Sequence, residues 1–277
     1  MNKEDFEIIK STGEKVSFSI PKLRGSLHKS GADAETVERI INIVRDELYQ
    51  GISTKEIYNR AFALLKKNKS VYASKYKLKR AIYELGPTGF PFEKFIGAVL
   101  QYSGYDIIVG KILQGKCVSH EVDVVAKKNG HHIVVECKFH SEKTINCNVK
   151  VPLYINSRFQ DIIGNYKTTN NCPNECWVVT NTRFTTDALT YGKCVGLFLL
   201  SWNYPKDDGL KDRIDRLGLY PITVSTLLTQ REKQFLLSRD IVLCRQLSND
   251  DFYLDHLGIS ESRKKRILNE VNDLCNI

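Results

Sequence analysis

The sequence predicts a mixed α/β protein in three parts: a mostly helical N-terminal part with a small β-ribbon, a central α/β part with a mixed sheet, and a small helical C-terminal part. Three observations predict this fold class. Residues 1–86 hold two short strand patterns followed by helical patterns, residues 87–206 alternate strands with helices, and residues 207–277 are helical throughout. A chain of 277 residues has room for two or three such domains.

The composition is that of a globular protein, with 42% hydrophobic and 26% charged residues. The formal net charge of +9 favours a polyanionic partner. No apolar run reaches the roughly 18–20 residues of a membrane span, so we expect no membrane partner. Because residues 1–5 lack an apolar signal segment, we expect a cytoplasmic protein.

The eight cysteines are scattered, which is typical of reduced thiols rather than a disulfide framework. Cys172 and Cys176 form the one close pair in the sequence, and no second pair at zinc-site spacing accompanies it. The sequence therefore disfavours a structural zinc site.

In the N-terminal part, residues 8–10 and 16–20 predict two strands joined by a polar turn, and Pro21 suits the first turn of a helix. Residues 35–49 have apolar side chains at helical spacing and predict a second helix. Ser53 and Glu56 have the spacing of a capping box, which predicts the start of a third helix.

Residues 66–80 carry seven basic side chains and no acidic one. This stretch has two interpretations: a solvated helix face with a loop, or a surface that binds the phosphates of a nucleotide or of DNA. Residues 86–89 read Gly-Pro-Thr-Gly, and we place a domain boundary there.

The central part begins with an apolar helical stripe through Phe92, Phe95 and Val99. A helix around 185–191 between two strand patterns predicts a βαβ unit with parallel pairing. We expect strands at residues 105–109, 122–126, 132–138, 177–180 and 196–201.

The C-terminal part contains a second capping box at Thr229 and Glu232. Residues 252–274 predict two short helices on either side of Gly258.

The strongest local prediction is a β-hairpin around Asn129-Gly130, a sequence typical of two-residue turns between strands. In that register Lys128 pairs with His131, Asp123 lies opposite Glu136, and Glu121 lies opposite Lys138. One face of the hairpin is then wholly apolar and is assigned to the core: Val122, Val124, Ala126, Ile133, Val135 and Cys137.

The opposite face of the hairpin brings Asp123, Glu136 and Lys138 together. Two carboxylates directly opposite one another repel, and a bound divalent cation such as Mg²⁺ removes that cost. Lys138 can then orient or deprotonate a water, or stabilise charge on a phosphate. The alternative is a surface hairpin whose acidic pair is softened by Lys127 and Lys138.

These residues resemble the Mrr-like branch of the PD-(D/E)xK nucleases, which have a restriction-endonuclease-like α/β fold. The matching text covers roughly residues 88–203 and reads Phe92-Glu93-Lys94-Phe95, His120-Glu121-Val122-Asp123-Val124 and Val135-Glu136-Cys137-Lys138. The resemblance implies that Asp123, Glu136 and Glu93 hold Mg²⁺ or Mn²⁺ and that Lys138 acts on the attacking water. His120 and Gln160 are weaker candidates near the site.

Residues 5–85 resemble the ATP-cone, a nucleotide-sensing domain. The matching residues include Ile9-Lys10, Gly13, Phe18, Lys22-Leu23, Gly51-Ile52-Ser53-Thr54 and Tyr76 with Arg80. The resemblance implies that Lys10, Lys22 and Thr54 contact ATP or dATP. A histidine common in that family is Tyr58 here.

The segment from Leu254 to Leu268 loosely resembles a helix-hairpin-helix, a motif whose backbone amides hold a DNA phosphate. Four consecutive basic residues, 263–266, would strengthen such contact, whereas the second glycine of the motif is Ser260 here. A plain helical cap is the alternative.

Taken together, the sequence and its resemblances predict a Mg²⁺-dependent DNA endonuclease regulated by ATP or dATP. The alternative is a non-cleaving, nucleotide-responsive DNA-binding regulator with a degenerate nuclease fold. No Walker-type phosphate loop is present, so we expect the nucleotide to act as an allosteric ligand and not as fuel. The sequence leaves open whether the chain forms a homo-oligomer.

Overall fold

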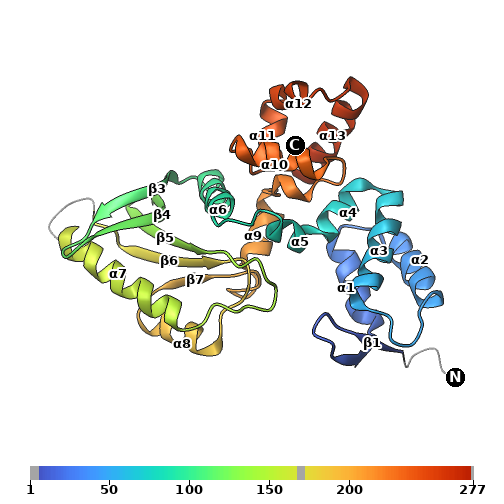
Figure 1. Cartoon of the computed structure of the whole chain (residues 1–277), viewed down its shortest axis with the longest axis horizontal. Helices are drawn as coiled ribbons and strands as arrows, with labels where there is room; N and C mark the ends of the chain where they lie inside the picture. The colour runs from blue at the N-terminus through green and yellow to red at the C-terminus, as the bar shows by residue number, and fades with distance from the viewer. Residues whose placement is uncertain (1–5, 167–171, 276–277) are drawn as a thin grey trace.

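The computed structural model of the chain describes residues 6–166 and 172–275. It contains a two-stranded sheet with helices, then a five-stranded mixed sheet covered by helices, then a group of helices (Figure 1). The predicted mixed α/β fold class is thus confirmed, with its parts in the predicted order. Among the described residues, no helix has both the length and the apolar character needed to cross a membrane. Residues 1–5 lie outside the described ranges.

The N-terminal part has its own hydrophobic cluster, which extends from Ile8 to Ala73. Strand β1 (Glu7–Ile9) pairs antiparallel with β2 (Lys15–Ser17). Five helices follow: α1 (Ile20–Lys29), α2 (Ala34–Asp46), α3 (Thr54–Asn68), α4 (Ser70–Tyr76) and α5 (Leu78–Tyr83).

The predicted start of α3 is confirmed, but its capping box is half formed. The Ser53 side chain accepts the Glu56 backbone N–H at 3.1 Å. The Glu56 carboxylate instead accepts from Tyr49 and Arg60, at 2.8 and 2.7 Å. A single cap bond therefore holds this helix start, and Glu56 serves contacts within the N-terminal part.

The central sheet has the order β3-β4-β5-β6-β7. The first three strands pair antiparallel and the last two join in parallel, with bounds β3 (Asp106–Gln114), β4 (Ser119–Lys128), β5 (His131–Lys138), β6 (Glu175–Thr180) and β7 (Phe198–Leu200). Helix α8 (Thr186–Cys194) connects the two parallel strands β6 and β7, which confirms the predicted βαβ unit. The sequence pattern predicts that this strand ends at Val109, but β3 continues to Gln114.

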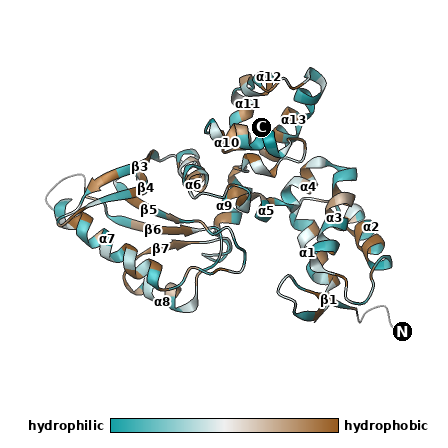
Figure 2. Cartoon of the chain, viewed as in Figure 1, coloured by the Kyte–Doolittle hydropathy of each residue, from teal (hydrophilic) through white to brown (hydrophobic). Residues whose placement is uncertain are grey.

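Helices cover both faces of this sheet, and strands β6 and β7 are among its most apolar elements (Figure 2). On one face α6 (Phe90–Tyr102) packs Phe92 and Phe95 into a cluster with Val124 and Val135. On the other face α7 (Lys150–Tyr166) and α8 enclose a second cluster. The hairpin β4–β5 therefore lies between two hydrophobic clusters, one on each face of the sheet.

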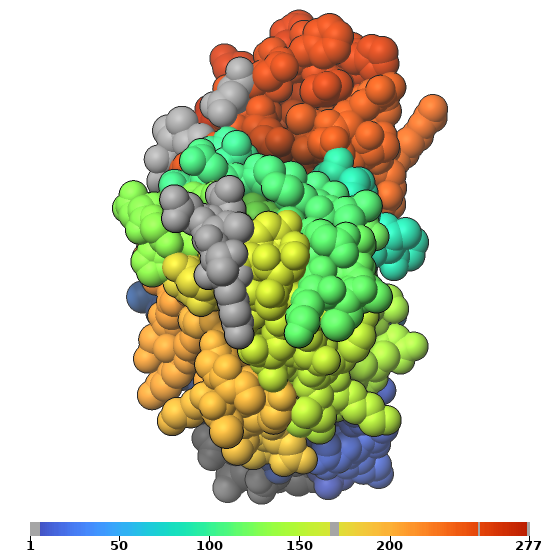
Figure 3. Space-filling model, turned by 90° about the vertical axis from the view of Figure 1, so that its left-hand side faces the viewer, coloured from blue at the N-terminus to red at the C-terminus, as the bar shows by residue number. Residues whose placement is uncertain are grey.

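The C-terminal helices join the same hydrophobic cluster as α6. Their bounds are α9 (Leu210–Leu217), the 3₁₀ turn η1 (Ile222–Val224), α10 (Gln230–Ser238), α11 (Cys244–Asn249), α12 (Phe252–His256) and α13 (Glu261–Cys275). The last four, α10 to α13, lie at the top of the molecule, above the sheet (Figure 3), whereas α9 lies lower, next to α5 (Figure 1). The capping box at Thr229 is complete, and α12 and α13 lie on either side of Gly258 as predicted.

The predicted position of Val122 is wrong. Val122 packs with Val125 and Val134 on the α7 face, whereas Val124 packs on the α6 face. The side chains of β4 change face next to Gly110 of β3, which has a φ of +67°. Gly110 lies opposite Asp123, between the pairs Val109–Val124 and Lys111–Val122. A left-handed glycine re-aims neighbouring side chains, as a β-bulge does.

Candidate active site

The turn of the β4–β5 hairpin sets the register of the site. Asn129 and Gly130 have φ values of +49° and +81°, as a two-residue turn with two left-handed residues requires. The ladder runs from Lys128–His131 to Val124–Val135, which confirms the predicted register over that range. This register carries the next residues of each strand, Asp123 and Glu136, to the same end of the hairpin.

At that end the backbone pairing of β4 with β5 stops, and the Asp123 side chain forms the next hydrogen bond to β5. Its Oδ2 accepts the backbone N–H of Cys137 at 2.6 Å. The carboxylate therefore lies against β5, next to Glu136, which is 8% exposed. Asp123 itself is only partly buried, so the site is reachable from solvent.

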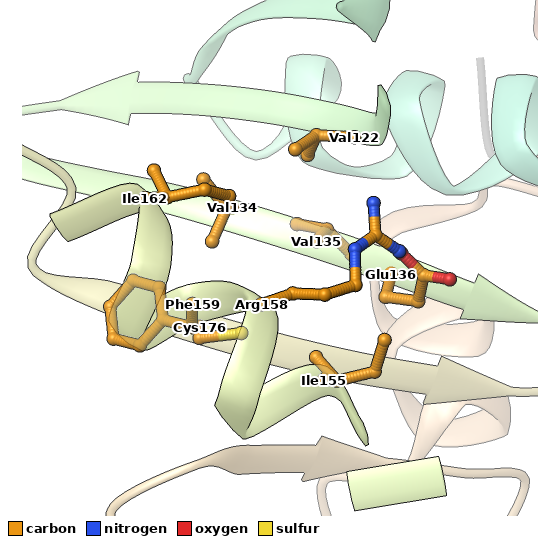
Figure 4. A pocket seen from close by; sticks show the side chains of 9 residues that line it. All are labelled: Val122, Val134, Val135, Glu136, Ile155, Arg158, Phe159, Ile162 and Cys176. Atoms are coloured by element: carbon orange, nitrogen blue, oxygen red, sulfur yellow. The ribbon is translucent and has the colours of Figure 1, made fainter. Parts of the chain in front are cut away.

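Glu136 is held between two basic side chains. Its Oε2 accepts from Nη1 of Arg158 on α7 at 2.8 Å, and its Oε1 accepts from Nζ of Lys138. Figure 4 shows the Arg158 guanidinium beside the Glu136 carboxylate, at the edge of a small, mostly apolar pocket of about 20 Å³. Arg158 also donates to the backbone carbonyl of Glu121 and thus ties α7 to both strands.

The electrostatics of the site reflect crowded negative charge. Burial, together with the charge of Glu136, raises the pKa of Asp123 to about 7. Burial and the charges of Glu136 and Glu121 also raise the pKa of Glu93, on the first turn of α6. Glu93 therefore interacts electrostatically with Asp123 and Glu136.

Lys138 is an ammonium ion in this environment. Burial alone would lower its pKa, but the hydrogen bond from Lys138 to Glu136 and the charges of Glu136 and Asp123 raise it above the ordinary value. A cation with a raised pKa is a poor base. Of the roles expected for Lys138, the structure therefore favours orienting a water or stabilising negative charge over deprotonation.

The donors suit a hard divalent cation in type, because Asp123, Glu136 and Glu93 all offer carboxylate oxygens. Such a cation would also relieve the repulsion that raises the pKa values of Asp123 and Glu93. Within residues 6–166 and 172–275, however, no three His, Cys, Asp or Glu side chains are arranged to hold a metal ion. A metal ion at Glu136 would compete with the two basic partners of its carboxylate, Lys138 and Arg158.

Sequence reasoning missed Arg158 as the α7 residue that reaches the site. It favoured Gln160, which is exposed. The other candidate, His120, donates through Nε2 to the Asp161 carboxylate of α7 at 2.8 Å. Asp161 also accepts the Cys117 backbone N–H, and the His120 hydrogen bond is the main reason why the pKa of Asp161 lies well below its usual range. The sequence places Arg158 in the same helix as Gln160, but it contains no further sign that Arg158 reaches the site.

The three residues expected to contact a nucleotide line one pocket of the N-terminal part. Lys10, Lys22 and Thr54 surround an open pocket of about 240 Å³ together with the aromatic rings of Tyr58 and Tyr76. Lys10 is ion-paired with Glu14 at 2.9 Å, whereas within the described residues Lys22 forms no ion pair.

Three of the seven basic side chains in residues 66–80 have polar contacts within the protein. Lys77 and Arg80 both pair with Glu84, and Lys66 donates to the carbonyl of Thr226. These three side chains are engaged within the protein, and phosphate binding by the other basic residues of the stretch stays a prediction.

In the helix-hairpin-helix-like segment, two of the four basic residues are engaged in ion pairs. Arg263 pairs with Glu232, and Lys264 pairs with Asp251 and Asp255. The other two, at 265 and 266, are exposed.

Comparison with known proteins defines the class of the chain. Residues 6–85 match the family model of the ATP cone domain, and residues 220–275 match a family described as AF1548-like, C-terminal. The protein therefore has an ATP-cone at its N-terminal end and an AF1548-like C-terminal domain.

The relatives extend this assignment over most of the chain. An uncharacterized protein of Archaeoglobus fulgidus is 31% identical over 173 residues, which are 62% of this chain and 95% of the relative. A crystal structure described as protein of unknown function AF1548 has a TM-score of 0.56 and 28% identity, covering 68% of this chain and 99% of that one. The chain belongs to this family of AF1548-like proteins.

Proposed function

We propose that the protein is a Mg²⁺- or Mn²⁺-dependent DNA endonuclease whose activity is controlled by ATP or dATP in the ATP-cone. The observation that carries the proposal is the position of Asp123 beside Glu136, just beyond the last paired residues of the hairpin, where burial and the charge of Glu136 raise the pKa of Asp123 to about 7. Structural carboxylates are seldom left in such a state, whereas metal and catalytic sites often contain them.

In this proposal each side chain of the site has a separate role in phosphodiester hydrolysis. A bound divalent cation would supply Lewis-acid polarisation of the scissile phosphate. Asp123, Glu136 and Glu93 would hold the cation through carboxylate oxygens. The Lys138 ammonium would stabilise the negative charge that develops on the phosphate and orient the attacking water. Arg158 positions Glu136 through their 2.8 Å ion pair.

Control by a nucleotide is supported by the ATP-cone match and by the pocket that Lys10, Lys22 and Thr54 share. The lysines would neutralise phosphate charge, and Thr54 lies at the N-terminal end of α3, where free backbone N–H groups favour anions. The net charge of +9 suits DNA as the substrate.

The experiment is a nicking assay on supercoiled plasmid with Mg²⁺ or Mn²⁺, with and without ATP or dATP. We expect the wild type to nick DNA and Asp123→Asn or Lys138→Met to lose at least 100-fold in rate. Asp187→Asn, an exposed acid of α8, is the matched control and keeps activity.

A non-cleaving, nucleotide-responsive DNA-binding regulator is the second candidate. The two ion pairs of Glu136, with Lys138 and Arg158, favour it, because they occupy both carboxylate oxygens. Failure of the wild type to cut duplex, branched or modified DNA, combined with nucleotide-dependent DNA binding, would replace the nuclease with this regulator.

A further inference from the structure

A second open pocket lies at the junction between the ATP-cone and the rest of the chain. Its volume is about 320 Å³, at the lower end of the size range of small-molecule sites, and domain junctions are common places for such sites. The ATP-cone contributes Lys29 of α1 together with Lys75 and Lys79 of the α4–α5 region. The other side contributes Trp202, which follows β7, and Lys211 of α9.

The charge of this pocket is strongly positive. Four lysines line it against one acid, Asp215, and that acid is already held by Lys211 Nζ at 3.5 Å and by the Tyr220 hydroxyl at 3.0 Å. Within the described part of the chain, Lys29, Lys75 and Lys79 form no ion pair with an acid. Uncompensated lysines that converge on one space are suited to a ligand with several negative charges.

The pocket adjoins the nucleotide pocket through a shared aromatic wall. Tyr58 and Tyr76 line both spaces, and their rings stack with centroids 5.0 Å apart. The Tyr58 hydroxyl is buried and has no hydrogen-bond partner among the described residues. A buried hydroxyl without a partner is costly, and a ligand on either side of the wall could supply one.

We propose that this junction pocket binds a small ligand carrying several phosphate groups, held by Lys29, Lys75 and Lys79 of the ATP-cone and facing Trp202 and Lys211. The volume sets the size of the ligand, and the lysines set its charge. Because both sides line the pocket, the bound ligand bridges the ATP-cone and the segment from Trp202 to Asp215. This site is distinct from the pocket of Lys10, Lys22 and Thr54, and it does not depend on nuclease activity.

The test is titration of the full-length protein with inorganic tripolyphosphate at fixed ionic strength, followed by tryptophan fluorescence. The chain has two tryptophans, Trp177 and Trp202, and Trp202→Phe should remove the signal. We expect the Lys75→Gln/Lys79→Gln variant to bind at least tenfold more weakly and Lys75→Arg/Lys79→Arg to retain binding. Lys22→Gln, in the nucleotide pocket, should leave this signal unchanged.

Two outcomes would overturn the proposal. Equal affinity of the wild type and the Lys75→Gln/Lys79→Gln variant, with both folded by circular dichroism, would mean that the lysines bind no such ligand. Competition by a short DNA duplex that is lost in the same variant would mean that the surface holds a nucleic-acid backbone instead of a small phosphorylated molecule.

Discussion

Arg158 of α7 and Glu136 of β5 form an ion pair of 2.8 Å in which both side chains are largely buried. The pair connects the helix on one face of the sheet to the strand that carries the candidate active site. Because Arg158 also donates to the carbonyl of Glu121 on β4, one guanidinium fixes the position of both hairpin strands relative to α7.

Replacing Arg158 by alanine should therefore lower both stability and activity. Glu136 would keep Lys138 as its one basic partner, and we expect a loss of about 1–3 kcal/mol of unfolding free energy. Chemical denaturation measures this loss, and the nicking assay measures the accompanying fall in rate. Lys150→Ala, at the exposed start of α7, is the control. An Arg158→Ala protein as stable as the wild type would contradict the positioning role.

Asp123 should make the stability of the protein depend on pH. Its pKa of about 7 in the folded protein lies above the ordinary 3.8, so between these values the folded state keeps a proton that the unfolded chain has lost. Stability on this account falls as pH rises from about 4 to about 7, by about 1.4 kcal/mol for each pH unit of difference in pKa.

Thermal unfolding of the wild type and Asp123→Asn in the presence of a chelator measures this effect. The variant should gain stability relative to the wild type as pH rises, with little difference near pH 4 and the largest difference above pH 7. A difference that does not change with pH would contradict the raised pKa.

The hairpin shows how far the sequence could predict this site. Asn129-Gly130 determines the turn, the turn determines the register, and the register brings Asp123 to Glu136; each of these steps is local. Val122 was misplaced because the exchange of faces depends on Gly110 in the neighbouring strand β3. A glycine among β-branched residues is a signal for such a distortion, although the strand pattern alone does not give its direction.

Arg158 could not be found in the same way. Its contact with Glu136 depends on how α7 packs on the sheet after a connection of more than ten residues, and no spacing in the sequence encodes that arrangement. The same limit applies to Glu270 of α13, which joins parts of the chain that are distant in sequence. Local patterns predicted the elements and the hairpin, whereas the contacts between elements required the tertiary structure.

Glu270 should hold the ATP-cone to the C-terminal helices. This carboxylate is 2% exposed and accepts from Ser74 of α4 at 2.8 Å, from Ser225 at 2.5 Å, and from the backbone and hydroxyl of Thr226. Glu270→Ala would leave these donors buried without an acceptor, at a cost of about 2–3 kcal/mol. We expect the Tm to fall by about 5–10 °C.

Glu261→Ala, an exposed position on the same helix, is the matched control for Glu270 and should shift the Tm by less than about 2 °C. Scanning calorimetry measures both variants. A Glu270→Ala protein that unfolds at the wild-type temperature would mean that the junction is held by its apolar contacts alone.

Lys22 should contribute more to nucleotide affinity than Lys10, although both line the pocket of the ATP-cone. Lys10 is already paired with Glu14 at 2.9 Å, so a phosphate must compete for it, whereas Lys22 forms no ion pair within the described residues. We expect Lys22→Ala to weaken ATP binding about tenfold, which corresponds to about 1.4 kcal/mol. Glu14→Gln should strengthen binding because it releases Lys10 from its partner. Isothermal titration calorimetry measures the ATP affinity of both variants, with Lys15→Ala at an exposed position of β2 as the control. A larger loss of ATP affinity from Lys10→Ala than from Lys22→Ala would contradict the greater contribution of Lys22.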